Sequence, residues 1–525
     1  MTRADIKLPT RGGAYMLILG VVIGMLAAGL AIPFVFGTPL STSGGSAVTS
    51  FGSPQTSNPL TGGGSNPATA AAAGTNPGAG PSTVAGSGTG ATANPSNANP
   101  SNAGLGLAAP AGPGSGPAAN PGGSKLSATD RGVTATTVTI GFTIADLGGV
   151  SKIGFAVPGF DPKTQETDDS IFLDYVNAHG GLLGRKVVPL YFRYDPTNQS
   201  SENSACLAAT QDHAIFAAID SGGGLSFQTQ LCFTQQNHTP LIAIGSFGTP
   251  TDMYQQALGN LFTIEASGVR ALGNAAYMLT SGGVLKGKHI GILDRDFPGT
   301  VQTVKDGMVA VLKDLGYTVA YRYDMSMDDG TASSQIPVAV QQMQAHGVDT
   351  VMLLTDFITG TEFVQSADKS AYRPLYITSD FESETNDTSV QAMPSSFQSV
   401  GVTASRVGEW RTGIPEPAVD AACRKIFTAA SGSTPARGDN AYAAMAVSCG
   451  VVDIFARGAR AAGTTLTRAA YVAGLQQIGA VGYPYFGGFS YRPGKRDGTD
   501  PIRLITYKSS CTCWVPAGNF LAPKY

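Results

Sequence analysis

Charged residues are absent from a long N-terminal stretch of this sequence. Between Arg11 and Lys125 there is no Asp, Glu, Lys, Arg or His. Over the whole chain the formal net charge is -3, and no basic stripe is visible. A protein that binds nucleic acid gathers Lys and Arg on one surface to neutralise phosphates. We therefore expect no nucleic-acid partner.

Motifs for catalysis or metal binding are also missing. The sequence has no G-x-S-x-G elbow, no H-E-x-x-H pair and no Walker loop. It has no C-x-x-C pair, and no Cys/His cluster has the spacing of a zinc site. We expect no enzyme activity, no cofactor and no metal. A secreted enzyme whose site is assembled from distant residues stays open as an alternative.

The sequence contains few cysteines, and their number is even. An even count favours disulfides in an exported chain, whereas in a cytosolic chain the same residues would more often be small core hydrophobes. The choice between the two therefore depends on the N-terminus. The six cysteines are Cys206, Cys232, Cys423, Cys449, Cys511 and Cys513.

The N-terminus carries a membrane signal. Residues 14–36 form an uncharged apolar run that can cross a ~30 Å hydrocarbon layer as a helix. Residues 1–13 carry basic side chains, which place that end in the cytoplasm. We predict a single-pass anchor in the cell membrane with an extracytoplasmic head. A cleaved signal peptide is the alternative, although its apolar region is normally shorter and followed by a small-residue cleavage site. Either reading exports the head and supports disulfides.

A stretch of Gly, Pro, Ser, Thr, Asn and Ala follows the apolar run. Residues 37–130 contain few large apolar side chains, so burial cannot offset the entropy of ordering them. We predict a disordered linker of roughly 50 Å root-mean-square reach, long enough to hold a head clear of the membrane.

From about Arg131 onward the pattern alternates short β-branched runs with helical stretches. VTIGFTI (138–144) and KVVPLYFRY (186–194) are typical strands, and a helical stretch ending at Gly180–Gly181 separates them. A second series of the same kind begins with KHIGIL (288–293). The rhythm predicts an α/β protein with parallel sheets covered by helices, with ligands bound in the loops after the strands.

Particular segments resemble a known family, the type 1 periplasmic binding proteins, in the leucine/isoleucine/valine-binding branch that feeds ABC importers. The resemblance covers about 136–514. It is strongest at DYVNAHGGLLGRKVVPLYFRYDP (174–196), which holds an N-x-x-G-G turn. PLIAIGSFGTP (240–250), KHIGILDRDFPGTVQTVKDGM (288–308) and HGVDTVMLLTDFITGTEFVQSA (346–367) follow in the expected order.

The resemblance implies two Rossmann-like lobes joined by a hinge, which close around a solute. Three chain crossings would lie near 263–268, 379–384 and 479–485. Lobe 1 would comprise about 131–264 plus 384–480, and lobe 2 about 265–383 plus 481–525. The family also implies a Cys206–Cys232 bridge, and Cys423–Cys449 on consecutive helices is a second candidate pair. Cys511 and Cys513 have no family counterpart, and they bridge each other or pair elsewhere.

In lobe 1, the family holds a ligand carboxylate with hydroxyls and backbone N–H groups after its third and fourth strands. The matching residues here are Ser226 and Phe227, then Gly245, Ser246 and Phe247. Phe247 replaces the small hydroxyl residue usual in branched-chain amino-acid binders. Ordinary loop polarity is the alternative explanation for the serines.

In lobe 2, the resemblance makes Asp380 the partner of a ligand ammonium. Asp356 or Phe357 matches a position often held by an aromatic residue, and Phe297 matches the aromatic that closes over the ligand. Ile153 replaces another frequent aromatic. Helix capping is the alternative role for Asp356 and Asp380. The pocket is therefore expected to be partly apolar.

These features predict an extracytoplasmic, membrane-tethered solute-binding protein. Its ligand would be amino-acid-like, an amide or an aromatic acid, and its partner an ABC-type importer. A ligand sensor that uses the same clamp without transport is the alternative.

Overall fold

The described part of the chain begins beyond the predicted membrane segment. The protein is represented by a computed structural model that describes residues 105–108, 126–147, 161–196, 198–245, 249–297, 299–327, 329–381 and 385–525. All of these belong to the unit Ala93–Tyr525. The predicted cytoplasmic N-terminus (1–13) and anchor (14–36) lie outside the described residues and stay predictions.

The first sheet has five parallel strands in the order β2-β1-β3-β4-β5. In β1, residues 140–145 are all buried, as expected for a parallel strand covered on both faces. The part of the chain around this sheet is called lobe 1. Its elements up to the first crossing are β1 (Thr137–Ala145), α3 (Pro162–Ala178), β2 (Lys186–Tyr194), α4 (Gln199–Leu207), η2 (Ala208–Asp212), β3 (Ala218–Asp220), α5 (Phe227–Leu231), η3 (Cys232–Gln236), β4 (Leu241–Ala243), α6 (Met253–Gln256) and β5 (Leu261–Thr263).

The second sheet has seven strands in the order β14-β13-β10-β9-β8-β6-β7. Strands β6 to β10 run parallel, and β13 and β14 form an antiparallel edge. The part around this sheet is lobe 2. Its elements are α7 (Gly268–Ser281), β6 (Ile290–Arg295), α8 (Thr300–Val304), η4 (Lys305–Val309), α9 (Ala310–Asp314), β7 (Val319–Met325), α10 (Asp329–Ala345), β8 (Thr350–Leu354), α11 (Phe357–Lys369), β9 (Leu375–Ser379), β10 (Ser399–Thr403), β13 (Arg503–Lys508) and β14 (Cys513–Pro516).

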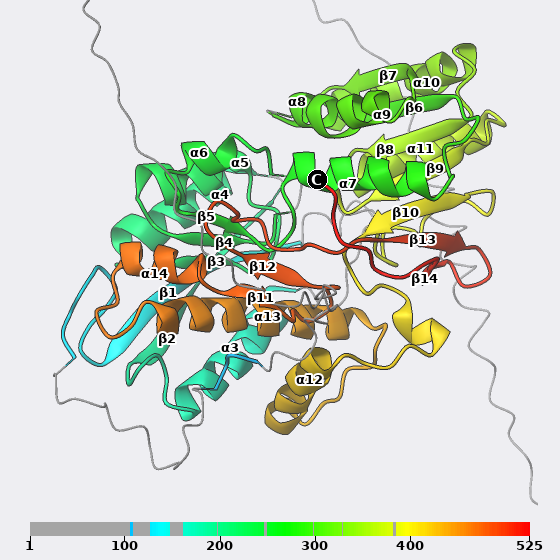
Figure 1. The fold of residues 1–525 in the computed structure, drawn as a ribbon. Helices are drawn as coiled ribbons and strands as arrows, with labels where there is room; N and C mark the ends of the chain where they lie inside the picture. The colour runs from blue at the N-terminus through cyan, green and yellow to red at the C-terminus, as the bar shows by residue number, and fades with distance from the viewer. Residues whose placement is uncertain are drawn as a thin grey trace, which may run out of the picture. The chain divides into compact units, whose positions relative to one another are not determined.

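Three later helices complete lobe 1. α12 (Ala418–Ser431) and α13 (Asn440–Ala461) pack against α3, and α14 (Arg468–Leu475) packs against α13. Figure 1 shows α3, α13 and α14 on one side of the first sheet and α4, α5 and α6 on the other. A separate two-stranded sheet, β11 (Gly479–Val481) with β12 (Phe489–Tyr491), follows α14. The predicted α/β class with two sheet-centred lobes is confirmed.

β10 departs from the predicted lobe boundaries. The sequence placed 384–480 in lobe 1, but β10 pairs with β9 on one side and with β13 on the other. That boundary is therefore wrong: the chain returns to lobe 1 only after Thr403, by way of η6 (Glu409–Thr412). A five-residue strand is assigned to a sheet only by its partners, and β13 lies about a hundred residues further along the chain.

The N-x-x-G-G turn has a direct physical explanation. The Asn177 amide donates to Val187 O at 3.0 Å and accepts from Val187 N at 2.8 Å, so one side chain ties the end of α3 to the start of β2. Gly181 has a positive φ of 61°, and a Cβ there would lie 2.2 Å from Arg185 O. Only glycine fits that backbone approach. The motif is thus a requirement of the α3–β2 connection.

α13 is the central helix of lobe 1. It is the one helix among the described residues that is long and apolar enough to cross a membrane, yet 78% of its most apolar window is buried inside the protein. Its apolar residues Met445, Val452 and Phe455 lie in the largest core cluster. Its apolarity is therefore accounted for by packing within the lobe.

Part of the predicted linker is ordered against α13. Leu107 is fully buried in the lobe 1 core, and its carbonyl accepts from Arg460 Nη2 at 2.9 Å. Gly106 N–H donates to Asp453, and residues 127–130 also bond to lobe 1. The prediction of disorder over 37–130 is wrong for 105–108 and 126–130. Composition missed them because two leucines in a Gly/Ala context carry no periodic signal.

Replacing Leu107 with alanine should release residues 105–108 from α13. Truncating a fully buried leucine removes about 2 kcal/mol or more of contact, and a four-residue segment has few other contacts to compensate. Amide hydrogen exchange at Gly106 and limited proteolysis between residues 105 and 126 would measure the release. Leu105→Ala, at a half-buried position, is the matched control and should have a smaller effect. Unchanged protection in the Leu107 variant would contradict the docking.

The structure forms three disulfides. Cys206 pairs with Cys232 and Cys423 with Cys449, as predicted, and each bridge joins residues 26 apart. Cys511 pairs with Cys513, which resolves the alternative left open by the sequence. The first two bridges are buried in lobe 1 and link consecutive helical segments.

Candidate functional site

Ser226 lies at the start of α5, in the loop that follows β3. Its Oγ accepts from Thr229 N at 3.3 Å, and its own N–H donates to Glu202 Oε2 at 2.9 Å. Thr229 Oγ1 also donates to Glu202, at 2.8 Å. Burial raises the pKa of Glu202, and these hydrogen bonds oppose the rise. Ser226 is therefore a helix cap in this structure, and its ligand role stays a prediction, as does that of half-buried Phe227.

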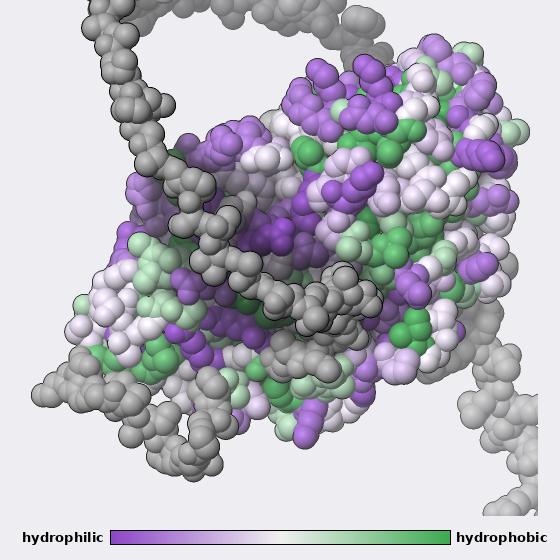
Figure 2. Space-filling model, viewed as in Figure 1, coloured by the Kyte–Doolittle hydropathy of each residue, from purple (hydrophilic) through white to green (hydrophobic). Residues whose placement is uncertain are grey.

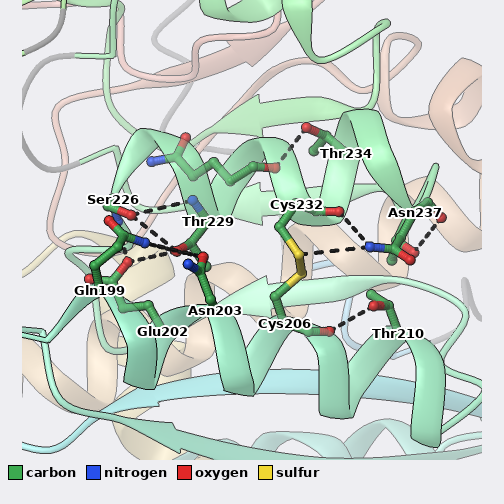
Figure 3. Close-up of a disulfide and its surroundings, with 12 residues drawn as sticks. Gln199, Glu202, Asn203, Cys206, Thr210, Ser226, Thr229, Cys232, Thr234 and Asn237 are labelled. Carbon is green, nitrogen blue, oxygen red and sulfur yellow. Dashed lines mark hydrogen bonds between the residues drawn. A yellow bond between two sulfur atoms is a disulfide. The ribbon is translucent and has the colours of Figure 1, made fainter. Parts of the chain in front are cut away.

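The Cys206–Cys232 bridge supports this corner of lobe 1. Figure 3 shows it linking the segment that carries Glu202 to the one that follows Ser226 and Thr229. The Asn237 amide donates to Cys232 O at 2.8 Å and closes the end of η3. The disulfide thus holds the two helices whose N-terminal ends meet in the Glu202 network.

Gly245 follows β4 and lies against the first crossing. Its φ is 90°, and a Cβ there would lie 3.2 Å from Thr263 Cβ and 3.4 Å from Glu265 Cβ. A side chain at this position would push the crossing segment away from lobe 1. The predicted neighbours Ser246 and Phe247 lie outside the described residues, as does Ile153.

A small cavity of ≈ 30 Å³ lies where the lobes join. Glu265 and Ala266 line it from the first crossing and Asp380 from just after β9. Thr499 and Asp500 line it from the segment between β12 and β13, which lies beyond the predicted crossing at 479–485. A cavity of this size holds one or two waters rather than a whole solute. By itself this cavity is therefore too small for a whole solute.

Asp380 directly follows β9, on the segment that leads to β10, and lines this cavity. Its carboxylate accepts from Ala404 N at 2.6 Å and from the Thr385 hydroxyl. Burial raises the pKa of Asp380, and hydrogen bonds and the charge of Arg503 counteract part of the rise. The residue does not cap one of the described helices; it holds the carboxyl ends of two neighbouring strands.

Glu265 is the residue that the sequence analysis missed. Burial raises its pKa well above the usual range, and the nearby charge of Asp380 raises it further. Gly245 and Asp380, predicted from opposite lobes, therefore both lie near the half-buried Glu265. The sequence did contain a signal, because an acid directly after a buried strand at a predicted crossing is unusual. Glu265 falls within the predicted crossing at 263–268, and the family resemblance gives it no ligand role.

A second group of predicted residues surrounds Arg295 at the end of β6. Arg295 Nη1 donates to Asp356 Oδ2 at 2.8 Å, and its guanidinium lies 4.6 Å from the Phe297 ring centroid. Asp356 also caps α11, accepting from Ile358 N and Thr359 N, as the alternative reading proposed. Phe357 is the first, half-buried residue of the same helix. Asp356 is thus paired with an arginine before any ligand arrives.

Loops of the two lobes touch beside these groups. A Cβ on Gly299, which precedes α8 in lobe 2, would lie 2.6 Å from Cγ of Pro250 in lobe 1. Gly268 N also donates to Thr249 O at 2.9 Å. Figure 2 shows hydrophilic side chains gathered in the recess between the parts that carry the two sheets. The described residues therefore combine a hydrophilic recess between the lobes with a small cavity lined by Glu265 and Asp380.

Comparison with known proteins agrees with the fold. Residues 170–512 match the model of a family described as periplasmic binding protein. No curated protein sequence matches the chain. A fatty acid ABC transporter substrate-binding protein from Thermomonospora curvata is 13% identical, with a TM-score of 0.55 over 75% of this chain and 95% of the other.

Two further solved structures share the fold. A solute-binding protein of an ABC transporter from R. palustris, in complex with 4-hydroxybenzoate, has a TM-score of 0.57 at 12% identity, over 74% of this chain and 98% of its own. A leucine-binding protein from Thermotoga maritima has a TM-score of 0.54 at 13% identity, over 73% and 98%. At these identities the likeness shows the fold alone.

Proposed function

The chain belongs to the periplasmic binding protein family, and we propose that it is an extracytoplasmic, membrane-tethered receptor for a small solute. The solute would be amino-acid-like, with an ammonium group beside Asp380 and a carboxylate toward lobe 1. The observation that carries this proposal is that two half-buried carboxyls, Glu265 and Asp380, line one cavity where the lobes join. Two neighbouring carboxyls that are partly shielded from water favour a cationic partner.

The named ligands of the structural neighbours support the anionic half of the solute. Leucine, 4-hydroxybenzoate and fatty acids all carry a carboxylate. The resemblance assigns this carboxylate to the loops after β3 and β4, where the sequence places Ser226 and Ser246. Delivery to an ABC-type importer follows from the same proposal, because the neighbours are named as transporter components.

The N-terminal sequence supports the tether. Residues 14–36 are apolar and uncharged, and basic residues precede them. The three disulfides fit an oxidising compartment outside the cytoplasm.

Asp380→Asn should weaken the binding of an amino acid about 30-fold while leaving an aromatic acid that lacks an amine nearly unaffected. The asparagine keeps an acceptor for Ala404 N but removes the charge that faces the ammonium, and a desolvated charge pair is worth roughly 2 kcal/mol. A thermal-shift screen of amino acids, amides and aromatic acids would first find the ligand, because a bound ligand raises apparent stability. Calorimetric titration would then measure both affinities.

Asp368→Asn is the matched control for this experiment. Asp368 lies in lobe 2, pairs with Arg373 at 2.8 Å and is about one-third exposed. Its substitution should change neither affinity. Equal losses for amine-bearing and amine-free ligands would remove Asp380 from the ammonium site. A screen in which no small solute shifts the melting temperature would contradict the binding function itself.

A further inference from the structure

The Cys511–Cys513 bridge lies in the turn between β13 and β14, at the edge of the second sheet. The last pair of the β13–β14 ladder is Lys508 with Cys513, and residues 509–512 form the turn. The bridge encloses one residue, Thr512. It is therefore part of a surface hairpin and joins no two elements that are distant in sequence.

This bridge is the accessible one of the three. Cys511 is exposed, whereas Cys513 is 1% exposed. The four cysteines of the lobe 1 bridges are all buried: Cys206 0%, Cys232 5%, Cys423 0% and Cys449 0%. Exchange begins when a thiolate reaches a disulfide sulfur, so access alone separates Cys511 from the other bridges.

The bridge also contributes little to holding the fold. The chain entropy that a disulfide removes from the unfolded state grows with the loop it closes, and this loop is much shorter than the 26-residue loops of the other two. Thr512 has a φ of 49°, a left-handed conformation that a β-branched residue adopts at a cost. Opening the ring would let Thr512 leave that conformation. Little structural stabilisation therefore opposes reduction.

Lys508 lies opposite Cys513 in the hairpin. The two residues face each other directly in the antiparallel ladder, so their side chains project from the same side of the sheet. The hairpin thus combines an exposed cysteine, Cys511, with a buried partner, Cys513.

We propose that Cys511–Cys513 is a reversible redox site that exchanges with a dithiol. One thiolate of the dithiol attacks Cys511 Sγ, the Cys511–Cys513 bond breaks, and Cys513 leaves as a thiolate. The second thiol of the reductant then attacks the mixed disulfide and frees Cys511. Two electrons and two protons pass to the protein, and the dithiol leaves as a disulfide.

The residue after the bridge would sense this change. Trp514 is fully buried. Its backbone N–H donates to Asp387 Oδ1 at 2.8 Å, and its backbone carbonyl accepts from Arg411. Arg411 in turn pairs with Asp387. A turn released next to Trp514 should therefore alter its surroundings and its fluorescence. Trp410→Phe leaves Trp514 as the single tryptophan.

The test is graded reduction of the full-length chain with dithiothreitol. Free thiols are blocked with N-ethylmaleimide at each concentration, and mass spectrometry of the digest reports which cysteines carry the label. Cys511 and Cys513 should be labelled at a dithiothreitol concentration at least tenfold lower than the other four cysteines. Trp514 fluorescence in the Trp410→Phe variant should change over the same range.

Two variants sharpen the experiment. Thr512→Gly accepts the left-handed conformation without strain and should need several-fold more dithiothreitol. Cys511→Ser with Cys513→Ser should fold normally and show no label or fluorescence change in the low range. A C-x-x-C protein dithiol, used in a parallel arm, would identify a protein source if it acts well below the effective dithiothreitol concentration, and a small-molecule source if it does not. Labelling of all six cysteines together, or of Cys511 and Cys513 last, would overturn the proposal.

Discussion

Arg270→Ala should lower the free energy of unfolding by about 3–5 kcal/mol, as expected when one partner of a buried ion pair is removed. Arg270 Nε donates to Asp497 Oδ2 at 2.6 Å, and Nη1 donates to Asp500 Oδ1 at 3.2 Å. The side chains of Arg270 and Asp497 are 15% and 9% exposed. Without the guanidinium, the carboxylates of Asp497 and Asp500 would keep the ammonium of Lys495 as their one cationic partner among the described residues.

The same arginine helps to hold the first crossing against the segment that leads into β13. Asp497 also accepts from Ser267 N at 2.8 Å, and Thr499 N donates to Ile264 O at 2.8 Å. These bonds join the segment that leaves β5 to the segment that leads into β13. Losing Arg270 should therefore loosen the hinge as well as the fold. Arg270→Lys keeps the charge but not the forked geometry, and an intermediate loss is expected.

Acid should reduce the difference between the Arg270→Ala variant and the native protein. Burial tends to raise the pKa of Asp497, but Arg270 and Lys495 outweigh burial and hold it below the usual value of 3.8. A depressed folded-state pKa contributes stability that is present above 3.8 and is lost as pH falls through the folded value. The Arg270→Ala variant lacks this contribution. The free energies of unfolding of the variant and of the native protein should therefore approach each other below about pH 4.

Chemical denaturation at pH 7 and pH 3.5 would measure this effect. Arg193→Ala is the matched control, because Arg193 forms a similar 2.7 Å pair with Glu166 but is 52% exposed. Its substitution should leave the denaturation midpoint nearly unchanged. Equal midpoints for the two alanine variants would show that the hinge ion cluster does not support the fold.

Asp169→Asn should stabilise the protein at pH 8 by up to about 4 kcal/mol. Asp169 lies on α3 and is completely buried, with Ser221 Oγ donating to its Oδ2 at 2.8 Å. Burial raises its pKa to about 7, against the opposing hydrogen bonds from Ser221 and Ser448. Asparagine has the same shape and keeps the acceptor for Ser221, but it carries no charge to desolvate.

The direction of the pH dependence of stability follows from proton linkage. A carboxyl with a raised folded-state pKa binds a proton more tightly in the folded chain, so stability falls as pH rises between about 4 and 7. Below pH 4 both states are protonated, and the advantage of asparagine should vanish. Asp168, also buried, has its pKa raised to about 7 by burial and then by the charge of Asp169. Removing Asp169 should therefore ease the ionisation of Asp168 and add to the gain.

Urea denaturation at pH 8, 6 and 4.5 tests this dependence. The gain should be largest at pH 8 and should shrink at each lower pH. Asp174→Asn, at an exposed position on the same helix, controls for a general effect of removing an acid from α3. An Asp169 variant that is less stable than the native protein at every pH would contradict the argument.

Local patterns were enough to predict the main elements. β1 and β2 were found from β-branched runs, and the end of α3 from Gly180–Gly181. These features depend on neighbours a few residues away, because strand and helix periodicity and turn chemistry are local. The N-x-x-G-G turn, which carried the family resemblance, is likewise explained by contacts between Asn177 and Val187.

Candidate site residues were harder to judge from the sequence, because their roles depend on partners far along the chain. Asp356 was predicted as a ligand residue, but its carboxylate is held by Arg295, 61 residues away. Asp294, adjacent to Arg295, pairs with Arg322 on β7. A strand-end charge can meet any charge at the same edge of a parallel sheet, and sequence spacing does not choose among them.

The sequence by itself determined the class of this protein: an uncharged, apolar N-terminal run, a Gly/Pro-rich stretch, and an α/β head with an even number of cysteines. Its composition and periodicity carry that information residue by residue. Tertiary structure alone decided that β10 belongs to lobe 2, that Leu107 is buried against lobe 1, and that Glu265 and Asp380 line one cavity. Each of these depends on contacts between residues far apart in the chain, which only the packed fold brings together.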